Sequence, residues 1–292
     1  MTTPSVSPAA DAYRARVDAV VAQRTRLRGP QPPGDLFAGL PAGHALLVSD
    51  PRRPLEPNLQ ALAAYLQPED VLVDVGGGAG RYSLPLALRC REVIDVDPSA
   101  AMLAGFEANA QRAGITNVRT VCAGWPMADP PRGTVALVTH VTYLTRDIVP
   151  FLAALTSAAS RRVLLTVNDP PPPSRHRALY QLLHGEPEEI VPGHAELVAV
   201  LRELGAAPEV RRLPDSTVEV STAPTRDGAI RSAISLAAGS QWAWWPLGDQ
   251  LTARLRHLLE TRFDELFQTT PTGYRPRWID TGHEVLITWA PS

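Results

Sequence analysis

Four glycines follow a short apolar segment near residue 71. Residues 71–73 (VLV) are apolar and rich in β-branched side chains, which is typical of a strand buried on both faces of a parallel sheet. Asp74 follows, and a helical pattern begins at about Arg81. The glycines between them are Gly76, Gly77, Gly78 and Gly80. They would let a ligand approach the backbone, and the helix would offer unpaired N–H groups, so the order predicts a nucleotide-type site.

The residues around this loop indicate what kind of nucleotide would bind. A P-loop needs Lys-Ser or Lys-Thr after its last glycine, whereas Arg81 and Tyr82 follow here and the chain contains no lysine. A loop that binds a pyrophosphate reads G-x-G-x-x-G, whereas the spacing from Gly76 is G-x-G-x-G. Asp74 would repel a diphosphate. The pattern therefore favours a ligand that carries an ammonium group.

A second acid follows at the end of the next predicted strand, residues 92–97. An acid roughly 20 residues beyond the loop is where a nucleoside ribose finds its acceptor, and a carboxylate can bond both hydroxyls. Asp97 is the candidate. Asp95 competes, because alternation turns both side chains to the same face, and only the strand end favours Asp97.

Together these segments resemble class I S-adenosylmethionine (SAM)-dependent methyltransferases. The run DVGGGAG resembles that family's motif I, and VDPSAAML is similar to its V-D-x-S-x-x-M-L pattern. The resemblance implies that Asp97 binds the ribose of SAM and that Met102 packs against adenine. The other cofactor-binding residues that it implies here are Asp74, Gly76, Gly77, Gly78 and Pro98.

The next predicted strand, residues 117–122, ends before Ala123, Gly124 and Trp125. Many relatives carry an acid at the position of Cys122, where it bonds the adenine amino group. This chain departs from that pattern. Adenine recognition would then use backbone groups near Ala123 and Gly124, with Trp125 stacking on the ring.

The residues after the fourth predicted strand, residues 135–139, match the family's motif IV position, where the sulfonium and the acceptor meet. The run Thr139-His140-Val141-Thr142-Tyr143, like HGEP at residues 184–187, is similar to a bacterial group of methyltransferases whose substrate is unassigned. The resemblance places Thr139 at the cofactor and Tyr143 in the acceptor pocket. His140 could act as a general base, because the pKa of histidine lies near neutrality. The alternative is a structural histidine bonded to a backbone carbonyl.

These motifs predict an enzyme that transfers a methyl group from SAM by direct displacement to a small-molecule acceptor, at O, N or C. An RNA or protein methyltransferase and a SAM-binding module without turnover are the alternatives. A nicotinamide dehydrogenase is opposed by Asp74 and by the glycine spacing. Neither Cys90 nor Cys122 stands in a recognisable catalytic or metal-binding setting.

The composition indicates which partners and which cellular compartment to expect. The net charge is −2 over 292 residues, and all 28 basic side chains besides histidine are arginine. A near-neutral balance argues against broad contact with phosphates, so DNA is not expected. The sequence shows neither a signal-peptide pattern nor an apolar run of the roughly 20 residues that span a bilayer. A cytoplasmic protein without a membrane contact is the expectation.

Strands alternate with helices through the middle of the chain, which predicts an α/β fold. The resemblance implies a Rossmann-like, mostly parallel sheet in the order 3-2-1-4-5-7-6, with residues 284–289 as its antiparallel last strand. We expect an N-terminal helical arm over residues 1–54, with a helix at 9–28, and a methyltransferase domain over 55–292. A helical insertion is expected at about 222–278, with helices at 227–238 and 247–267. The aromatic run QWAWW at residues 241–245 could line an acceptor pocket, form a homodimer contact or attach the insertion to the domain.

Overall fold

The computed structural model describes residues 7–31, 34–35, 50–171, 176–214, 222–238, 247–278 and 282–291. The predicted tryptophan run at 241–245 and most of the arm after residue 31 lie outside these residues. The two predicted domain boundaries are not tested by the structure and stay predictions.

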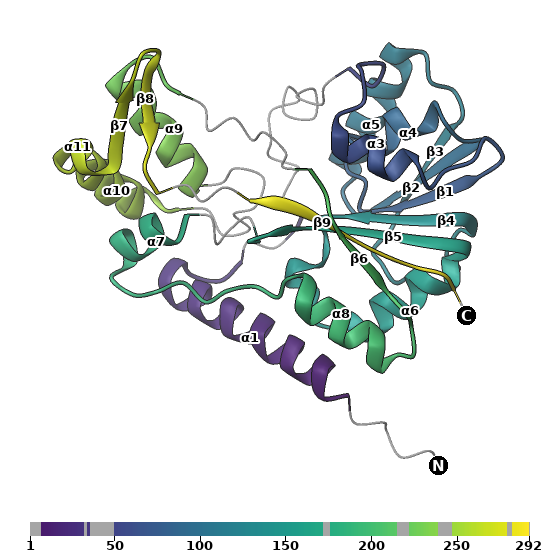
Figure 1. The fold of residues 1–292 in the computed structure, drawn as a ribbon. Helices are drawn as coiled ribbons and strands as arrows, with labels where there is room; N and C mark the ends of the chain where they lie inside the picture. The colour runs from purple at the N-terminus through teal and green to yellow at the C-terminus, as the bar shows by residue number, and fades with distance from the viewer. Residues whose placement is uncertain are drawn as a thin grey trace.

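A seven-stranded sheet forms the centre of the molecule (Figure 1). Its strands in spatial order are β3 (Val118–Cys122), β2 (Glu92–Asp97), β1 (Val71–Val75), β4 (Gly133–Thr139), β5 (Ala159–Asp169), β9 (His283–Trp289) and β6 (Glu209–Arg212). The first five are parallel, and β9 runs antiparallel to both β5 and β6. The predicted order is confirmed. The strand expected as the seventh is β9, since the two strands of a separate hairpin, β7 and β8, come before it in the chain.

Helices cover both faces of the sheet (Figure 1). On one face lie α1 (Pro8–Arg28), α6 (Ile148–Ala158) and α8 (His194–Glu203). On the other lie α3 (Pro57–Ala63), α4 (Ser83–Ala87) and α5 (Ala100–Ala113). Alternation divides β1 between the layers: Val71 and Val73 pack towards α1, whereas Leu72 packs towards α4. Asp74 therefore shares the face of α4 and α5.

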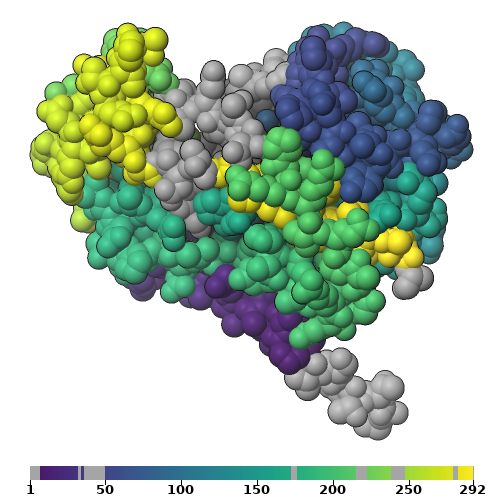
Figure 2. All heavy atoms as spheres, in the orientation of Figure 1, coloured from purple at the N-terminus to yellow at the C-terminus, as the bar shows by residue number. Residues whose placement is uncertain are grey.

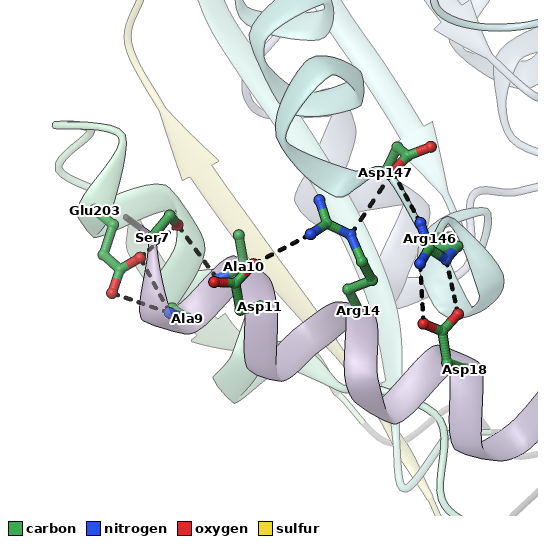
Figure 3. A network of polar contacts seen from close by, with 9 residues as sticks. All are labelled: Ser7, Ala9, Ala10, Asp11, Arg14, Asp18, Arg146, Asp147 and Glu203. Carbon is green, nitrogen blue, oxygen red and sulfur yellow. Dashed lines mark hydrogen bonds and ion pairs between the residues drawn. The ribbon is translucent and has the colours of Figure 1, made fainter. Parts of the chain in front are cut away.

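The N-terminal helix α1 is held to the sheet by its buried face and by ion pairs along its exposed side. Tyr13, fully buried, donates a hydrogen bond to the carbonyl of Thr142, 2.5 Å away. Figure 3 shows the outer contacts: Glu203 of α8 accepts from the first turn of α1, and Asp18 pairs with Arg146 at 2.7 Å. The helix predicted over residues 9–28 is thus an integral layer of the fold.

A C-terminal lobe stands beside the sheet. It consists of α7 (Arg177–His184), α9 (Arg226–Ala238), α10 (Asp249–Thr261), α11 (Phe263–Leu266), β7 (Phe267–Thr270) and β8 (Gly273–Pro276). These elements share their own apolar core. In Figure 2 the last part of the lobe, residues 249–276 in yellow-green to yellow, lies on the opposite side of the view from the blue residues of α3 and α4. The chain enters the lobe after β5 and again after β6, and leaves it after α7 towards α8 and after β8 towards β9. The ends of β5 and β6 and the start of β9 lie together at the edge of the sheet where the parallel strands end.

The lobe departs from the sequence prediction in two elements. Helix α7 was not predicted, and the single helix expected over residues 247–267 ends earlier, with Phe267 beginning a strand. Phe263 and Phe267, four residues apart as on one helical face, do stack at 4.5 Å between ring centroids. Both rings fill the same core, so their spacing in the sequence looks helical. The backbone nevertheless changes from helix to strand between them.

Candidate cofactor and acceptor site

The glycine loop is held against the end of β2. Gly76 donates its N–H to the carbonyl of Val96 at 2.7 Å and has a positive φ of 74°. A Cβ added to it would lie 2.5 Å from a methyl group of Val141, which follows β4. A side chain at residue 76 would therefore be both strained and in collision. The bare turn lets the end of β4 approach the loop, and so brings the predicted cofactor and acceptor segments together.

Gly77 covers two carboxyl groups. A Cβ on this residue would lie 2.3 Å from Oδ2 of Asp74 and 2.6 Å from Oδ1 of Asp95. Its N–H donates to Asp95 Oδ1 at 3.1 Å. Both aspartates have 0% exposed surface, so they lie beneath the loop. The structure thus places Asp74 behind the glycines, rather than open to solvent in front of them.

Asp97 occupies the end of β2 beside Gly78. Its carboxylate accepts the N–H of Gly78 at 3.1 Å and the N–H of Ser99 at 2.8 Å. Burial raises the pKa of Asp97, the two backbone hydrogen bonds oppose that rise, and the charge of Asp35 adds to it. The Met102 sulfur lies 4.0 Å from the Cβ position of Gly78. Asp97, Gly78 and Met102 therefore meet, as the motif spacing predicts.

The residues expected at adenine lie on both sides of the end of β2. Ala123 donates its N–H to the carbonyl of Asp97 at 3.2 Å, so it is adjacent to the predicted ribose site. Gly124 and Pro98 are exposed. The Trp125 indole packs against the α1 side of the core and donates to the carbonyl of Phe151 at 3.3 Å.

His140, directly after β4, is held by side chains around one of its ring nitrogens. Nε2 lies 3.0 Å from Oε1 of Glu284 on β9 and 3.0 Å from the hydroxyl of Tyr82, which itself donates to Glu284 at 2.5 Å. Asn58 donates to the other oxygen of Glu284 at 2.9 Å. His140 also has a positive φ of 60°, a conformation that costs energy in a residue other than glycine.

The second ring nitrogen faces two further groups. Nδ1 lies 3.2 Å from the hydroxyl of Tyr143 and 3.1 Å from the amide nitrogen of Asn168. Tyr143 in turn accepts the backbone N–H of Asn168 at 2.7 Å, so its own hydrogen is directed to Nδ1. An amide nitrogen can only donate and a carboxylate can only accept. These partners match an imidazole that carries a hydrogen on Nε2.

Glu284 completes this cluster and was not foreseen from the sequence. Burial alone would raise its pKa, but the hydrogen bond and charge interaction with His140, the hydrogen bond from Tyr82 and the charge of Arg81 together lower it. Glu284 is thus held as a carboxylate although it is only 4% exposed. A charged residue within the apolar run HEVLITW was the one available signal, since buried glutamates are rare unless paired.

The remaining predicted residues are at the same edge. Thr139 ends β4 and is 9% exposed, and Tyr143 is 3% exposed, so its hydroxyl serves the cluster. In the described part of the chain, no group of three His, Cys, Asp or Glu side chains could hold a metal ion. Nor does any helix among the described residues have the length and apolar character needed to cross a membrane.

Known proteins share the central part of this chain. A sequence-family model described as a methyltransferase domain matches residues 72–161. The chain is 32% identical over 116 residues to the 23S rRNA (uracil(1939)-C(5))-methyltransferase RlmD of Aeromonas salmonicida, covering 33% of this chain and 26% of that protein. It is 30% identical over 117 residues to an uncharacterised protein of Haemophilus influenzae, covering 39% of this chain and 43% of that protein. The chain thus spans about a quarter of the length of RlmD.

Solved structures share the fold over most of this chain at low identity. A SAM-dependent methyltransferase from Thiobacillus denitrificans, in complex with S-adenosyl-L-homocysteine, has a TM-score of 0.51 and 13% identity, with 89% of this chain and 100% of that chain covered. The YcgJ protein from Bacillus subtilis has a TM-score of 0.51 and 16% identity, with 80% and 98% covered. Residues 72–161 therefore match a methyltransferase domain, and the chain has a fold seen in SAM-dependent methyltransferases.

Proposed function

We propose that this protein transfers a methyl group from SAM to a small-molecule acceptor. The observation that carries the proposal is the glycine loop bounded by carboxyl groups: Asp97 at its side and Asp74 beneath it, where a diphosphate would be repelled. Neither oxygen of Asp74 has a hydrogen-bond partner among the described residues, and the Ser83 hydroxyl lies outside hydrogen-bond geometry. Buried anionic groups of this kind fit a ligand that is positively charged.

Different residues at the edge of the loop would bind different parts of the cofactor. Asp97 would accept the ribose hydroxyls, and Met102 and Ala123 would lie along the adenine. The methionine part of SAM would lie over the turn of Gly76, Gly77 and Gly78, where the missing side chains let a ligand approach the backbone. SAM, when bound, supplies the electrophilic methyl group, while the protein aligns the acceptor and excludes water.

The cluster around His140 would form the floor of the acceptor site. Glu284 fixes the ring through Nε2, which leaves Nδ1 as the nitrogen that could take a proton from an acceptor. Nδ1 already accepts from Tyr143 and Asn168, so a proton would reach it through the Tyr143 hydroxyl or after Asn168 turns away. The Glu284 carboxylate would stabilise the imidazolium so formed. His140 is thus the candidate base, and Glu284 is its positioning residue.

An RNA acceptor is the second candidate, favoured by the activity of RlmD on 23S rRNA. Arginine pairing supports a small molecule instead, because an RNA surface requires unpaired basic side chains. Several exposed arginines pair with acids of the same surface. Such pairs are Arg14–Asp11, Arg119–Glu92, Arg146–Asp18, Arg231–Asp227 and Arg262–Glu265.

Calorimetric titration tests the cofactor. SAM should bind and NAD should not. Asp97→Ala should weaken SAM binding by roughly a hundredfold, since it removes charge-assisted hydrogen bonds. Asp264→Ala, at an exposed site in the lobe, should bind SAM as the unaltered protein does. Binding of NAD in place of SAM, or an Asp97→Ala variant with full affinity, would refute the assignment.

The acceptor is found by transfer of an isotope-labelled methyl group from SAM. Label should enter the small-molecule fraction of a cell extract, and Glu284→Gln should slow that transfer by roughly tenfold or more. Label that appears in RNA from the same extract, and not in small molecules, would favour the second candidate.

A further inference from the structure

Asp74 and Asp95 lie side by side beneath the glycine loop. They are register partners on the neighbouring parallel strands β1 and β2, so their side chains leave the sheet on the same face. Both have 0% exposed surface, and one oxygen of each points to the underside of Gly77. Their distances to the Cβ position of Gly77 put these two oxygens within about 5 Å of each other.

The surroundings of the pair add negative charge and few donors. Among the described residues, the groups that act on its protonation are Asp97 on β2, the Gly77 N–H in the loop and Ser83 on α4. Burial raises the pKa of Asp74 and of Asp95, and the neighbouring carboxylates raise both further. Two adjacent buried carboxylates without a cation cannot both ionise near neutral pH.

We propose that Asp74 and Asp95 share one proton in the ligand-free protein, and that a cationic cofactor bound over the glycine loop expels it. The carboxyl O–H bond breaks, the proton passes to the buffer, and the carboxylate stays as the counter-charge of the ligand. Asp95 is then a positioning residue that sets when Asp74 is charged. A diphosphate could not expel this proton, so the pair also selects the class of cofactor. The inference rests on the proposed function for the identity of the cation.

The test is calorimetric titration of the full chain with SAM at pH 7.0 in phosphate and in Tris. The ionisation enthalpies of these buffers differ, so the difference in heat counts the protons released. The unaltered protein should release between about half a proton and one proton per SAM. The affinity of the unaltered protein for SAM should rise about three- to tenfold per pH unit between pH 6 and 7.5. A reaction that releases a proton is favoured as the proton concentration falls.

The variant Asp95→Asn tests the pair, because it removes one of the two carboxyl groups. Its amide oxygen can still accept the Gly77 N–H, and its NH₂ group can donate to Asp74, which keeps Asp74 ionised before the ligand arrives. This variant should release less than about a fifth of a proton, with an affinity that varies less than about twofold over the same pH range. Asp264→Asn should match the unaltered protein. The amino group of SAM titrates alike in all three proteins, so only the difference between them is assigned to the pair.

The outcomes separate the two proposals. SAM binding without proton release in the unaltered protein overturns the shared proton and leaves the cofactor assignment intact. The same proton release in Asp95→Asn as in the unaltered protein also overturns it. If Asp95→Asn does not fold, the buffer dependence and the pH dependence of the unaltered protein still decide. Absence of SAM binding at any pH refutes the proposed function itself.

Discussion

Two buried polar clusters at the ends of the parallel strands are built in opposite ways. Beneath the glycine loop, Asp74 and Asp95 bring like charges together with few donors. Behind β4, Glu284 is a carboxylate surrounded by donors: Tyr82, Asn58 and His140. Burial raises the pKa of Asp74 and of Asp95. The pKa of Glu284 is lowered instead, because its hydrogen-bond partners outweigh burial.

The difference indicates which half of the site is complete without a ligand. The Glu284 cluster satisfies its charge within the protein, so its geometry is fixed in advance. The aspartate pair lacks a counter-charge, and such a site gains most when a cation arrives. We infer that the proposed acceptor half is preorganised, whereas the proposed cofactor half is tuned by ligand binding. Each of the following predictions tests that contrast.

The largest effect is expected from removal of the carboxylate that joins the acceptor cluster. Glu284→Ala leaves the donors of Tyr82, Asn58 and His140 buried without an acceptor, so the free energy of unfolding should fall by about 3–5 kcal/mol. Glu284→Gln keeps one acceptor oxygen and should lose only about 1–2 kcal/mol. Urea denaturation at pH 7 measures both. Equal, small losses in the two variants would mean that the cluster is not preorganised.

A methyl group above the aspartate pair should have the next largest effect. Gly77→Ala places a Cβ 2.3 Å from Oδ2 of Asp74, and the free energy of unfolding should fall by about 2–3 kcal/mol. Gly124→Ala is the matched control, since a Cβ there meets no atom within 4 Å. The comparison is made by denaturation of both variants without ligand. A Gly77→Ala protein as stable as the control would show that the carboxyl groups do not fill the space beneath the loop.

The cofactor half was largely predictable from the sequence, because its parts are close together along the chain. A buried strand, a glycine run and an acid at a fixed distance place Gly78, Met102 and Asp97 in one site by local geometry alone. The sequence also signalled Asp95 as a competitor of Asp97. It gave no sign that Asp95 would lie under the loop, because that depends on the register of β1 with β2.

The acceptor half was predictable only at His140. Glu284 lies 144 residues further along the chain and reaches His140 because β9 inserts between β5 and β6. In the sequence, Tyr82 served only to exclude a P-loop, and its contact with Glu284 was not predicted. Helix α7 and the β7–β8 hairpin were missed for a related reason: their apolar residues pack against each other within a small separate core. Local patterns do not encode which distant segments share a core.

A smaller effect is expected from charge relief in the aspartate pair. The folded-state pKa of Asp95 is raised above its unfolded value, to about 9. The group therefore contributes its stability fully below the unfolded pKa, near 4, and that contribution is lost as pH rises towards 9. Asparagine does not titrate. Asp95→Asn should gain about 2 kcal/mol in unfolding free energy over the unaltered protein between pH 6 and pH 7.5, since one extra bound proton changes the stability by about 1.4 kcal/mol per pH unit.

Denaturation without ligand at several pH values measures that gain, with Asp264→Asn as the control. If the stabilities of Asp95→Asn and of the unaltered protein stay parallel from pH 5 to pH 8, Asp95 is ionised throughout. The two clusters would then not differ in the way inferred here.

The smallest effect is expected in the acceptor cluster, at Tyr143. Tyr143→Phe removes the acceptor of the Asn168 N–H and one donor to Nδ1 of His140, so the unfolding free energy should fall by about 1 kcal/mol. The sharper measurement is the ¹⁵N spectrum of His140. Glu284 still accepts from Nε2 and the Asn168 amide still faces Nδ1, so the hydrogen should stay on Nε2 in both proteins. A hydrogen on Nδ1 in the unaltered protein would instead require the Asn168 amide to present its oxygen. The lone pair of a neutral ring would then be on Nε2, where it faces the Glu284 carboxylate, and Nδ1 could not take a proton from an acceptor.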